Sequence, residues 1–393
     1  MCDNVLWLGS TIAGEYEKQL LSVYGKPFMI AQSNLEKALI KGLLFYNVKI
    51  EAWTTPTIPY HLMNKGIFEQ KKKVEIENNF FSSTYPILKC SFLRYIYIFI
   101  YTFYIAYKFC ARNKNGKIFI ATNFLPVSIP TLIVGKIFRV KVTCMFCDLI
   151  DDLYENRMNK FRKYYMKLTK FVNKNFDSYV FITDEMNDKV NKKNRSYCVI
   201  EGIYNADLEY KNIKKKNIFI YSGSLIKKYG IDTAIRVFKK ANLNDYELHI
   251  YGDGEYKEEM LKSIENEEKI KYKGLVSREM LFQKLMEAKF LLNLRDPRDE
   301  FTKYSFPSKI FEYLASGTCV ISTKLEGIPE EYFDYMITCE TGKDESLVET
   351  FKNVVNLNED ELKGLGLAGR KFVVDKKNSI KQAKLLYELL RKG

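Results

Sequence analysis

Short apolar runs alternate along the chain with longer segments whose apolar residues recur at helical spacing. The runs are rich in β-branched and aromatic residues and end at glycine or polar residues, which is typical of buried strands. Strands are expected at residues 5–9, 48–54, 117–122, 140–146, 178–183 and 197–201, and again at 217–222, 247–251, 270–272, 290–294, 319–322 and 336–339. Helical patterns between successive runs predict an α/β protein with mostly parallel sheets.

A polar stretch without periodicity separates two complete strand–helix series. We therefore expect an N-terminal domain over residues 1–204, a linker over 205–216, a second domain over 217–375 and a closing helix over 376–393. The expected architecture is two Rossmann-like domains facing a cleft at the carboxyl ends of their strands, where open α/β sheets bind ligands. The sequence leaves open which domain the closing helix packs against.

One uncharged segment, residues 95–107, allows three interpretations. Its 13 residues read YIYIFIYTFYIAY and are bracketed by Arg94 and Lys108. As a helix it is about 20 Å long, against roughly 30 Å of bilayer hydrocarbon. A buried core helix, a helix at a membrane surface and a membrane span all remain open, and the tyrosines suit an interface.

The charge balance narrows the choice of partners. Lysine and arginine outnumber the acidic residues by 62 to 48, which gives a net charge of +14. Such an excess favours phosphorylated substrates or an anionic membrane surface, and without a nucleic-acid motif we expect no nucleic-acid partner. The eight scattered cysteines are typical of free thiols in a reducing compartment, so we expect a cytoplasmic protein.

Metal and histidine chemistry are not expected. The chain has two histidines, no Asp-x-Asp sequence and a lone CxxC at Cys144 and Cys147, where strand geometry points the two thiols to opposite sides. The composition therefore argues against a histidine-based metal site or a catalytic triad.

The most informative segment, residues 304–317, reads YSFPSKIFEYLASG. Pro307 and Ser308 suit the start of a helix, where serine can cap free N–H groups. Such a helix start suits a phosphate, and Lys309 in its first turn is unfavourable unless an anion lies there. Glu312, one turn on, can accept hydrogen bonds from the vicinal hydroxyls of a ribose. This is the layout of a nucleotide-sugar site, and the alternative is an ordinary strand–helix turn with a surface lysine.

Other loops after strands of the second half provide further candidates. Gly223 and Ser224 allow close backbone approach, and Lys228 lies at a second positive helix start. The backbone around Lys273 and Leu275 can pair with the edge of a base. Arg295 belongs to the charged loop that leads into the segment described above.

Four motifs in this order and spacing resemble a known family. They are GSLIKKYGID, HIYGDGEY, KYKGLVSREML and YSFPSKIFEYLASG, and they resemble the C-terminal donor domain of family-4 glycosyltransferases of the GT-B fold, most closely the bacterial capsule and exopolysaccharide branch. The match is strong over residues 217–330, and the first half matches in layout only. The resemblance implies a retaining, metal-independent and cofactor-free transfer of a sugar from a nucleotide-diphosphate sugar to a hydroxyl of a glycan or lipid-linked acceptor.

The resemblance also implies roles for individual residues. Glu312 corresponds to the acidic residue that binds the donor ribose, Lys309 to the basic residue beside the diphosphate, and Gly223 with Ser224 to the glycine loop. Asp148 follows a strand where related enzymes often carry His–Asp, and it either orients the acceptor hydroxyl or caps a helix. The other donor-site candidates are Lys228, Lys273, Leu275, Arg295, Tyr304, Ser305, Pro307 and Ser308.

Three positions depart from the family pattern. Tyr304 stands where the family often has glutamate, Ser224 where it often has arginine and Tyr229 where it often has lysine. Neutralisation of the diphosphate then falls on Lys309, Lys228 and Arg295. These departures keep open an alternative, a catalytically silent GT-B-like subunit that binds nucleotide or supports a partner transferase.

Overall fold

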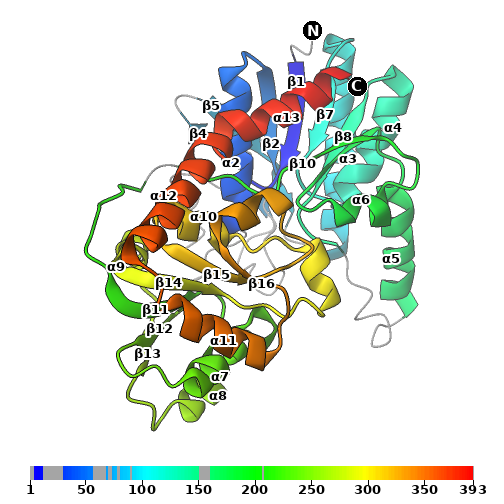
Figure 1. The fold of residues 1–393 in the computed structure, drawn as a ribbon. Coiled ribbons are helices and arrows are strands. Elements are labelled where there is room, and N and C mark those ends of the chain that lie inside the picture. Colours follow the sequence, from blue (N-terminus) through cyan, green and yellow to red (C-terminus); the bar gives the residue numbers. More distant parts are fainter. Residues whose placement is uncertain are drawn as a thin grey trace. The chain divides into compact units, whose positions relative to one another are not determined.

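The computed structural model describes residues 4–11, 30–55, 68–69, 73–77, 80–88, 91–149, 160–205 and 208–392. The chain forms two compact units, Met1–Ile200 with Ser379–Gly393, and Glu201–Asn378. Each unit contains a large, mainly parallel sheet with helices on its faces (Figure 1). The prediction of an α/β protein with two parallel-sheet domains is therefore confirmed.

The sheet of the first unit has eight strands in the order β10-β9-β8-β7-β1-β2-β5-β4. All neighbours pair in parallel except β4, which runs antiparallel to β5 at the edge. Its strands are β1 (Asn4–Gly9), β2 (Lys49–Thr54), β4 (Lys73–Glu77), β5 (Phe80–Thr84), β7 (Lys117–Ile120), β8 (Val142–Phe146), β9 (Ser178–Phe181) and β10 (Ser196–Val199). A small antiparallel pair joins β3 (Phe68–Glu69) to β6 (Ile87–Leu88). The sequence did not predict β3 to β6, because none of these strands carries a long apolar run.

Helices cover both faces of this sheet. Three helices connect strands that follow one another in the same direction along the sheet: α3 (Ser91–Arg112), α4 (Leu125–Phe138) and α5 (Lys160–Asn173). Because crossover connections between parallel strands are right-handed, all three helices lie on the same face of the sheet. Helix α2 (Ile30–Phe45) crosses in the opposite direction, and α6 (Glu185–Val190) follows β9. In Figure 1, α13 (Ser379–Lys392) lies along α2.

The closing helix α13 packs against α2 in the first unit. A Cβ added at Gly42 of α2 would lie 2.3 Å from the carbonyl oxygen of Ser379, so glycine is needed for this close approach. The rings of Tyr46 and Tyr387 stack with centroids 5.1 Å apart. The choice that the sequence left open is thereby resolved.

The aromatic segment of residues 95–107 lies within α3. One stripe of this helix, Ile98, Thr102, Ile105 and Phe109, is buried against the unit. None of the helices in the described ranges is long and apolar enough to cross a membrane.

The second unit is built on a six-stranded sheet in the order β13-β12-β11-β14-β15-β16, with every neighbouring pair parallel. Its strands are β11 (Lys216–Ser222), β12 (Glu247–Tyr251), β13 (Ile270–Gly274), β14 (Ala288–Asn293), β15 (Cys319–Thr323) and β16 (Ile337–Cys339). The helices are η3 (Lys227–Tyr229), α7 (Ile231–Ala241), α8 (Lys257–Ser263), α9 (Arg278–Glu287), η4 (Glu300–Tyr304), α10 (Lys309–Ala315), η5 (Glu330–Tyr335), α11 (Asp344–Val354) and α12 (Glu359–Lys376).

Both faces of this sheet are buried, which explains why its strands read as continuous apolar runs. Phe219 and Ile250 belong to a core with α7, α8 and α11. Ile220 and Leu291 belong to a second core with α9, α10 and α12. Because the sheet is parallel, the loops that follow its strands gather at one edge, where most of the sequence-predicted site residues lie.

Candidate functional site

Two glycines bring the loops after β11 and β12 into backbone contact. Gly223 and Gly252 have φ values of +151° and +140°. The Gly223 N–H donates to the carbonyl oxygen of Tyr251 at 3.0 Å, and a Cβ at Gly252 would lie 1.9 Å from the Gly223 carbonyl oxygen. No other residue type fits at Gly252, so the loops after β11 and β12 lie in close backbone contact. The predicted approach of the Gly223 and Ser224 backbone to a diphosphate stays a prediction.

A third glycine brings the next loop alongside. Gly230, with φ +89°, ends η3 and precedes α7. A Cβ at this position would lie 2.3 Å from the carbonyl oxygen of Leu294. This contact places Tyr229, from the loop after β11, beside Arg295, from the loop after β14.

Arg295 is a largely buried cation. Its guanidinium carbon lies 4.7 Å from the centroid of the Tyr229 ring, and one of its NH groups donates to the Ser305 hydroxyl at 3.3 Å. The Arg295 carbonyl oxygen accepts a hydrogen bond of 2.6 Å from Thr323, which fixes the loop to β15. Burial lowers the pKa of Arg295. Among the residues that the structure describes, no carboxylate pairs with it, and a buried charge without a counter-ion is costly.

Lys228 adds a second cation over the same aromatic rings. Its ammonium lies 5.1 Å from the centroid of the Phe301 ring and 5.5 Å from that of Tyr229, and the Arg295 guanidinium lies 6.0 Å from Phe301. Asp299 is close enough for Lys228 to influence its pKa, but the two form no ion pair. Two like charges held together favour a multivalent anion between them.

Helix α10 is tied to the end of β11 by a buried tyrosine. The Tyr313 hydroxyl accepts a hydrogen bond of 2.8 Å from the Ser222 N–H, and it donates to the Ser222 carbonyl oxygen at 3.1 Å. Burial raises the pKa of Tyr313 to about 12, so the hydroxyl keeps its proton. Sequence reasoning missed this residue, although a hydroxyl within a buried helical stripe was a signal for it.

The expected capping by Ser308 is wrong. Ser308 precedes α10, but its side chain makes no capping bond, because its backbone is already helical at φ −54° and ψ −22°. The turn starts earlier, with the Ile310 N–H donating to the carbonyl oxygen of Pro307 at 2.9 Å. Pro307 is buried, and Tyr304 and Ser305 are half-buried before it.

The anion expected beside Lys309 is provided by the chain itself. The Lys309 ammonium lies 2.7 Å from a carboxylate oxygen of Glu312, and the Arg278 Nε lies 3.3 Å from the other. These contacts orient Glu312, whose side chain is 19% exposed. A carboxylate has about four acceptor positions and an ammonium three donors, so Glu312 can still receive ribose hydroxyls while Lys309 contacts a phosphate.

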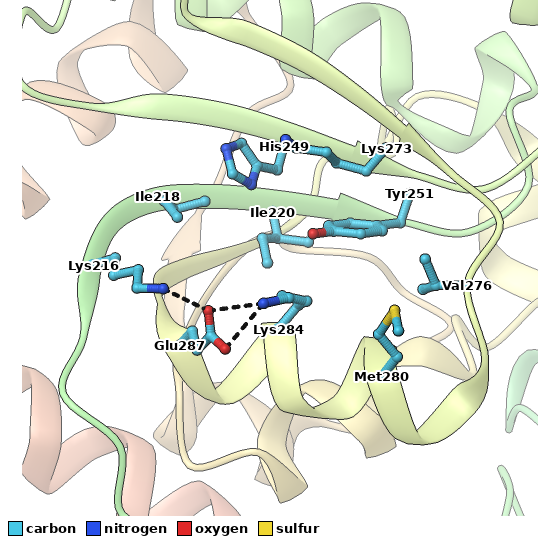
Figure 2. Close-up of a pocket in the computed structure, with 10 residues that line it drawn as sticks. All are labelled: Lys216, Ile218, Ile220, His249, Tyr251, Lys273, Val276, Met280, Lys284 and Glu287. Atoms are coloured by element: carbon cyan, nitrogen blue, oxygen red, sulfur yellow. Dashed lines mark hydrogen bonds and ion pairs between the residues drawn. The ribbon is translucent and has the colours of Figure 1, made fainter.

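A groove lies next to the loop of Lys273 and Leu275 (Figure 2). Its volume is about 300 Å³, and it lies between α9 and the strands β11 and β12. Tyr251 and Val276 form part of an apolar lining, while the Leu275 side chain is 74% exposed beside it. Lysines at the rim include Lys216 and Lys284, both paired with Glu287 at 2.8 and 3.1 Å. Apolar walls of this kind suit a flat ring.

In the first unit, Asp148 follows β8 as predicted. The residue is exposed, yet partial desolvation of its carboxyl group raises the pKa of Asp148. Residues 150–159, which bear on the helix-capping interpretation, lie outside the described residues. The neighbouring Cys147 is half-buried, and the pKa of its thiol is raised by burial and by the nearby Glu36 and Asp148 carboxyls.

Sequence reasoning missed Glu36, a fully buried carboxyl on α2. It accepts hydrogen bonds from the Ser10 N–H and hydroxyl at 3.1 and 2.9 Å, from the Thr11 hydroxyl at 2.8 Å and from the Trp7 indole at 3.2 Å. Burial raises the pKa of Glu36. The signal was an acidic residue on the apolar face of a predicted helix, and its effect is to fix the chain directly after β1.

The predicted donor-site residues thus fall into two groups in the second unit. One contains Gly223, Arg295 and Ser305, and the other contains Lys309 and Glu312. The hydrogen bonds between the Tyr313 hydroxyl and Ser222 hold the helix of the second group at the end of β11, which leads into the loop of Gly223. In the described parts of the chain, no cluster of three or more histidine, cysteine or acidic side chains could hold a metal ion.

Comparison with known proteins assigns this region. Residues 206–372 match the family model of group 1 glycosyl transferases. No curated protein sequence matches the chain at a significant level.

Solved structures share the fold of the whole chain at low sequence identity. Sucrose-phosphate synthase from Thermosynechococcus elongatus matches with a TM-score of 0.65 and 14% identity, over 99% of this chain and 98% of its own. Anabaena HepE in complex with UDP matches with 0.61 and 11%, over 99% and 100%. The pneumococcal O-GlcNAc transferase GtfA, in complex with UDP and GlcNAc, matches with 0.61 and 11%, over 99% of both chains.

A longer protein matches in part. S. aureus TarM matches with a TM-score of 0.55 and 16% identity over 73% of this chain, which spans 58% of the length of TarM. Together, these matches show that the chain has the two-domain GT-B fold and that its residues 206–372 resemble the group 1 glycosyl transferases.

Proposed function

We propose that the protein is a retaining family-4 glycosyltransferase that acts without a metal ion. It moves a hexosyl group from a nucleotide-diphosphate sugar to a hydroxyl of a glycan or lipid-linked acceptor in bacterial capsule or exopolysaccharide biosynthesis. The observation that carries this proposal is the pair of cations, Arg295 and Lys228, which have no carboxylate partner among the described residues and lie beside the glycine loop at the carboxyl ends of the strands of the second sheet. A diphosphate is the anion that matches two adjacent positive charges.

The donor binds along this edge in the proposed complex. Its diphosphate lies against Gly223, Ser224 and the cations Arg295, Lys228 and Lys309. Its ribose hydroxyls donate to Glu312. Its base lies near Lys273 and Leu275, at the end of the groove lined by Tyr251 and Val276. The 304–308 segment, held by the contact between Arg295 and Ser305, closes the site around the diphosphate.

The reaction breaks the bond between the anomeric carbon and the diphosphate oxygen and forms a bond from the acceptor oxygen on the same face of the sugar. The acceptor proton passes to the departing diphosphate, and Asp148 orients the acceptor hydroxyl. The chemistry therefore depends on stabilising a leaving group and aligning an acceptor. Each preorganised contact to the developing charge is worth about 2.7–4 kcal/mol.

Two of the three departures from the family pattern, Tyr229 and Ser224, are compatible with activity. Tyr229 does not supply a lysine, but its ring supports the Arg295 guanidinium at 4.7 Å, so a cation reaches this place from another loop. At Ser224 the chain lacks the arginine that the family often has, and Arg295 and Lys228 supply positive charge in its place. We therefore favour the enzyme over the catalytically silent subunit.

We also propose that the enzyme works in the cytoplasm as a peripheral protein at the inner face of the cell membrane. The excess of basic residues and the aromatic helix α3 support this location, which a lipid-linked acceptor would require.

A thermal-shift screen of nucleotide diphosphates and nucleotide sugars tests the proposal. A ligand at about one hundred times its Kd stabilises the folded state by about 2.7 kcal/mol, so one base is expected to raise the Tm by roughly 5 °C or more. Failure of every nucleotide to raise the Tm would contradict donor binding. Binding without release of nucleotide diphosphate, together with a co-purifying transferase, would establish the silent subunit instead.

A further inference from the structure

Helix α3 carries a second apolar stripe on the side away from the sheet. Leu93, Ile96, Ile100, Tyr104 and Tyr107 follow one another at spacings of three or four residues, and each is between 44% and 62% exposed. The opposite stripe of the same helix is buried in the unit. A helix that is apolar on two faces is expected to be covered on both, so the outer stripe indicates a partner surface.

Helix α5 presents a different outer face. Its buried residues are Met166, Thr169 and Val172, which are spaced as one helical stripe. On the exposed side, Tyr164 and Phe171 are 69% and 67% exposed, one heptad apart. The exposed residues around these rings are Lys160, Lys163, Lys167, Lys170 and Lys174. Large aromatic rings surrounded by lysines are typical of helices that lie at a membrane interface.

Helix α4 connects the other two into one surface. It packs along α3, and the rings of Tyr107 and Phe138 meet edge-on with centroids 5.2 Å apart. Its own outer face exposes Ile133 and Ile137 by 41% and 61%. On its other side α4 contacts α5. Figure 1 shows the three helices on one face of the first sheet, and we call their outer faces the α3–α5 surface.

The charge of this surface has one sign only. The chain contains 48 acidic residues, but α3, α4 and α5 contain none. The same helices contain nine lysine and arginine residues, three, one and five respectively. A second copy of this chain would bring like charges together across such an interface, which is unfavourable. An anionic bilayer offers phosphate groups to the lysines and an apolar layer to the exposed rings.

We propose that the α3–α5 surface docks on a bilayer of anionic phospholipids, with the α5 lysines at the lipid phosphates and the α3 stripe at the boundary between headgroups and acyl chains. This inference rests on the proposed function, since it explains how the enzyme reaches a lipid-linked acceptor. It goes further by assigning the contact to three named helices of the first unit.

The test is co-sedimentation with phosphatidylcholine vesicles that contain or lack phosphatidylglycerol. The parent protein is expected to bind only the anionic vesicles, and less at high salt. The triple variant Lys163→Glu, Lys167→Glu, Lys174→Glu is expected to bind them roughly a hundredfold more weakly, because each lysine near the surface contributes about fivefold. Binding of the parent protein to both kinds of vesicle alike, or to neither, would overturn the proposal.

A matched control changes the same number of charges elsewhere. Lys262, Lys363 and Lys371 are exposed lysines of the second unit, and their triple replacement by glutamate is expected to retain most of the binding. Equal losses in the two triple variants would show that net charge alone attracts the protein, which would overturn the assignment to the α3–α5 surface.

A second variant tests the apolar stripe without changing charge. Ile100→Gln with Tyr104→Gln is expected to weaken vesicle binding by about tenfold, because both side chains leave the lipid boundary. Size-exclusion chromatography of the parent protein tests the competing possibility, that a second copy of the chain covers the stripe. A dimer that this variant converts to monomer would assign the stripe to a second copy and overturn membrane docking.

Nucleotide binding, measured by thermal shift on the same variants, separates the two proposals. All variants are expected to keep the Tm increase caused by the nucleotide, since the α3–α5 surface belongs to the first unit. If the parent protein binds nucleotide but does not bind vesicles, the docking surface alone is refuted. Vesicle binding by a protein that no nucleotide stabilises would refute the donor site alone.

Discussion

The second unit contains two sets of cations that differ in whether a carboxylate pairs with them. At the junction of α7 and α11, Arg236 makes two hydrogen bonds of 2.7 and 2.9 Å to Asp344, and Lys240 lies 2.6 Å from the same carboxylate. At the carboxyl edge of the sheet, Arg295 and Lys228 rest on aromatic rings with no such partner in the described chain. The protein therefore neutralises the cations that hold it together and leaves charge unneutralised where a ligand is expected.

Lys309 is intermediate between these two sets. It pairs with Glu312, but both side chains remain accessible, and the pair lies at the start of a helix rather than between packed elements. Such a pair can exchange one partner for a ligand without unfolding anything. The distinction between paired and unpaired cations can be tested by replacing one member of each set.

The largest effect is expected for Arg295→Met. Loss of this guanidinium should weaken binding of the nucleotide diphosphate and slow sugar transfer by roughly a hundredfold to a thousandfold, because it removes one preorganised contact to the diphosphate. The ligand-free protein should be as stable as the parent or more so, since a buried charge without a partner has been removed. Isothermal titration calorimetry and thermal unfolding measure the two effects separately.

Arg236→Met is the matched control, and it should change stability rather than nucleotide binding. Nucleotide affinity should stay unchanged, while the free energy of unfolding should fall by about 1 kcal/mol because a partly exposed ion pair is lost. If the Arg295 variant instead lost stability and kept its affinity, Arg295 would belong with the structural cations.

The next effect concerns Lys309→Ala, which should reduce transfer by at least about a hundredfold while leaving the fold intact. Arg278 remains to hold Glu312, so the ribose contact should survive and the loss should appear mainly in kcat. Steady-state kinetics check this split. Lys324→Ala, which removes a half-buried lysine paired with Glu330, provides the control and should be close to the parent in activity. Near-normal turnover of the Lys309 variant would remove its proposed role.

A smaller effect concerns acid stability. Hydrogen bonds and charges from Arg236 and Lys240 lower the pKa of Asp344 to about 2, below its usual 3.8. A carboxyl with a lowered folded-state pKa stabilises the protein above its unfolded pKa, and this stabilisation is lost as the pH falls from about 4 to about 2. Asp344→Asn should therefore cost about 1–2 kcal/mol at neutral pH, and the difference should shrink through that range.

Urea unfolding of the parent and the Asp344 variant at several pH values measures this dependence. Glu349→Gln on the same helix, an exposed residue, should show no comparable change. A difference between parent and Asp344 variant that stays constant down to pH 2 would contradict the assigned cause.

The fold was more predictable than the site. Strand β15 (Cys319–Thr323) begins where the apolar run predicted and ends one residue later, because a strand buried on both faces leaves an unbroken signal in sequence. Helix α11 was not predicted, and β3 to β6 were missed, because short or strongly charged elements take their stability from tertiary packing. Ser308 was placed correctly before a helix, but its capping role depended on one backbone dihedral that the sequence does not specify.

The state of each charge was the least predictable property of the site. The sequence identified Arg295 and Lys309 as candidates, but it did not show that Glu312 pairs with one and that the other stays unpaired. Pairing depends on which loops meet, and that was decided by Gly230 against Leu294 and by Tyr313 against Ser222. For the same reason Glu36 was not recognised, since its donors Trp7, Ser10 and Thr11 are more than twenty residues away in sequence.

The most direct test is a crystal structure of the protein soaked with the nucleotide diphosphate that stabilises it most. The diphosphate is expected in contact with the Arg295 guanidinium and the Gly223 backbone, with the Lys309 ammonium turned toward it and the ribose hydroxyls on Glu312. A bound nucleotide that leaves Arg295 on Tyr229 without a phosphate contact, or that lies elsewhere on the molecule, would contradict the central claim that the unpaired cations form the donor site.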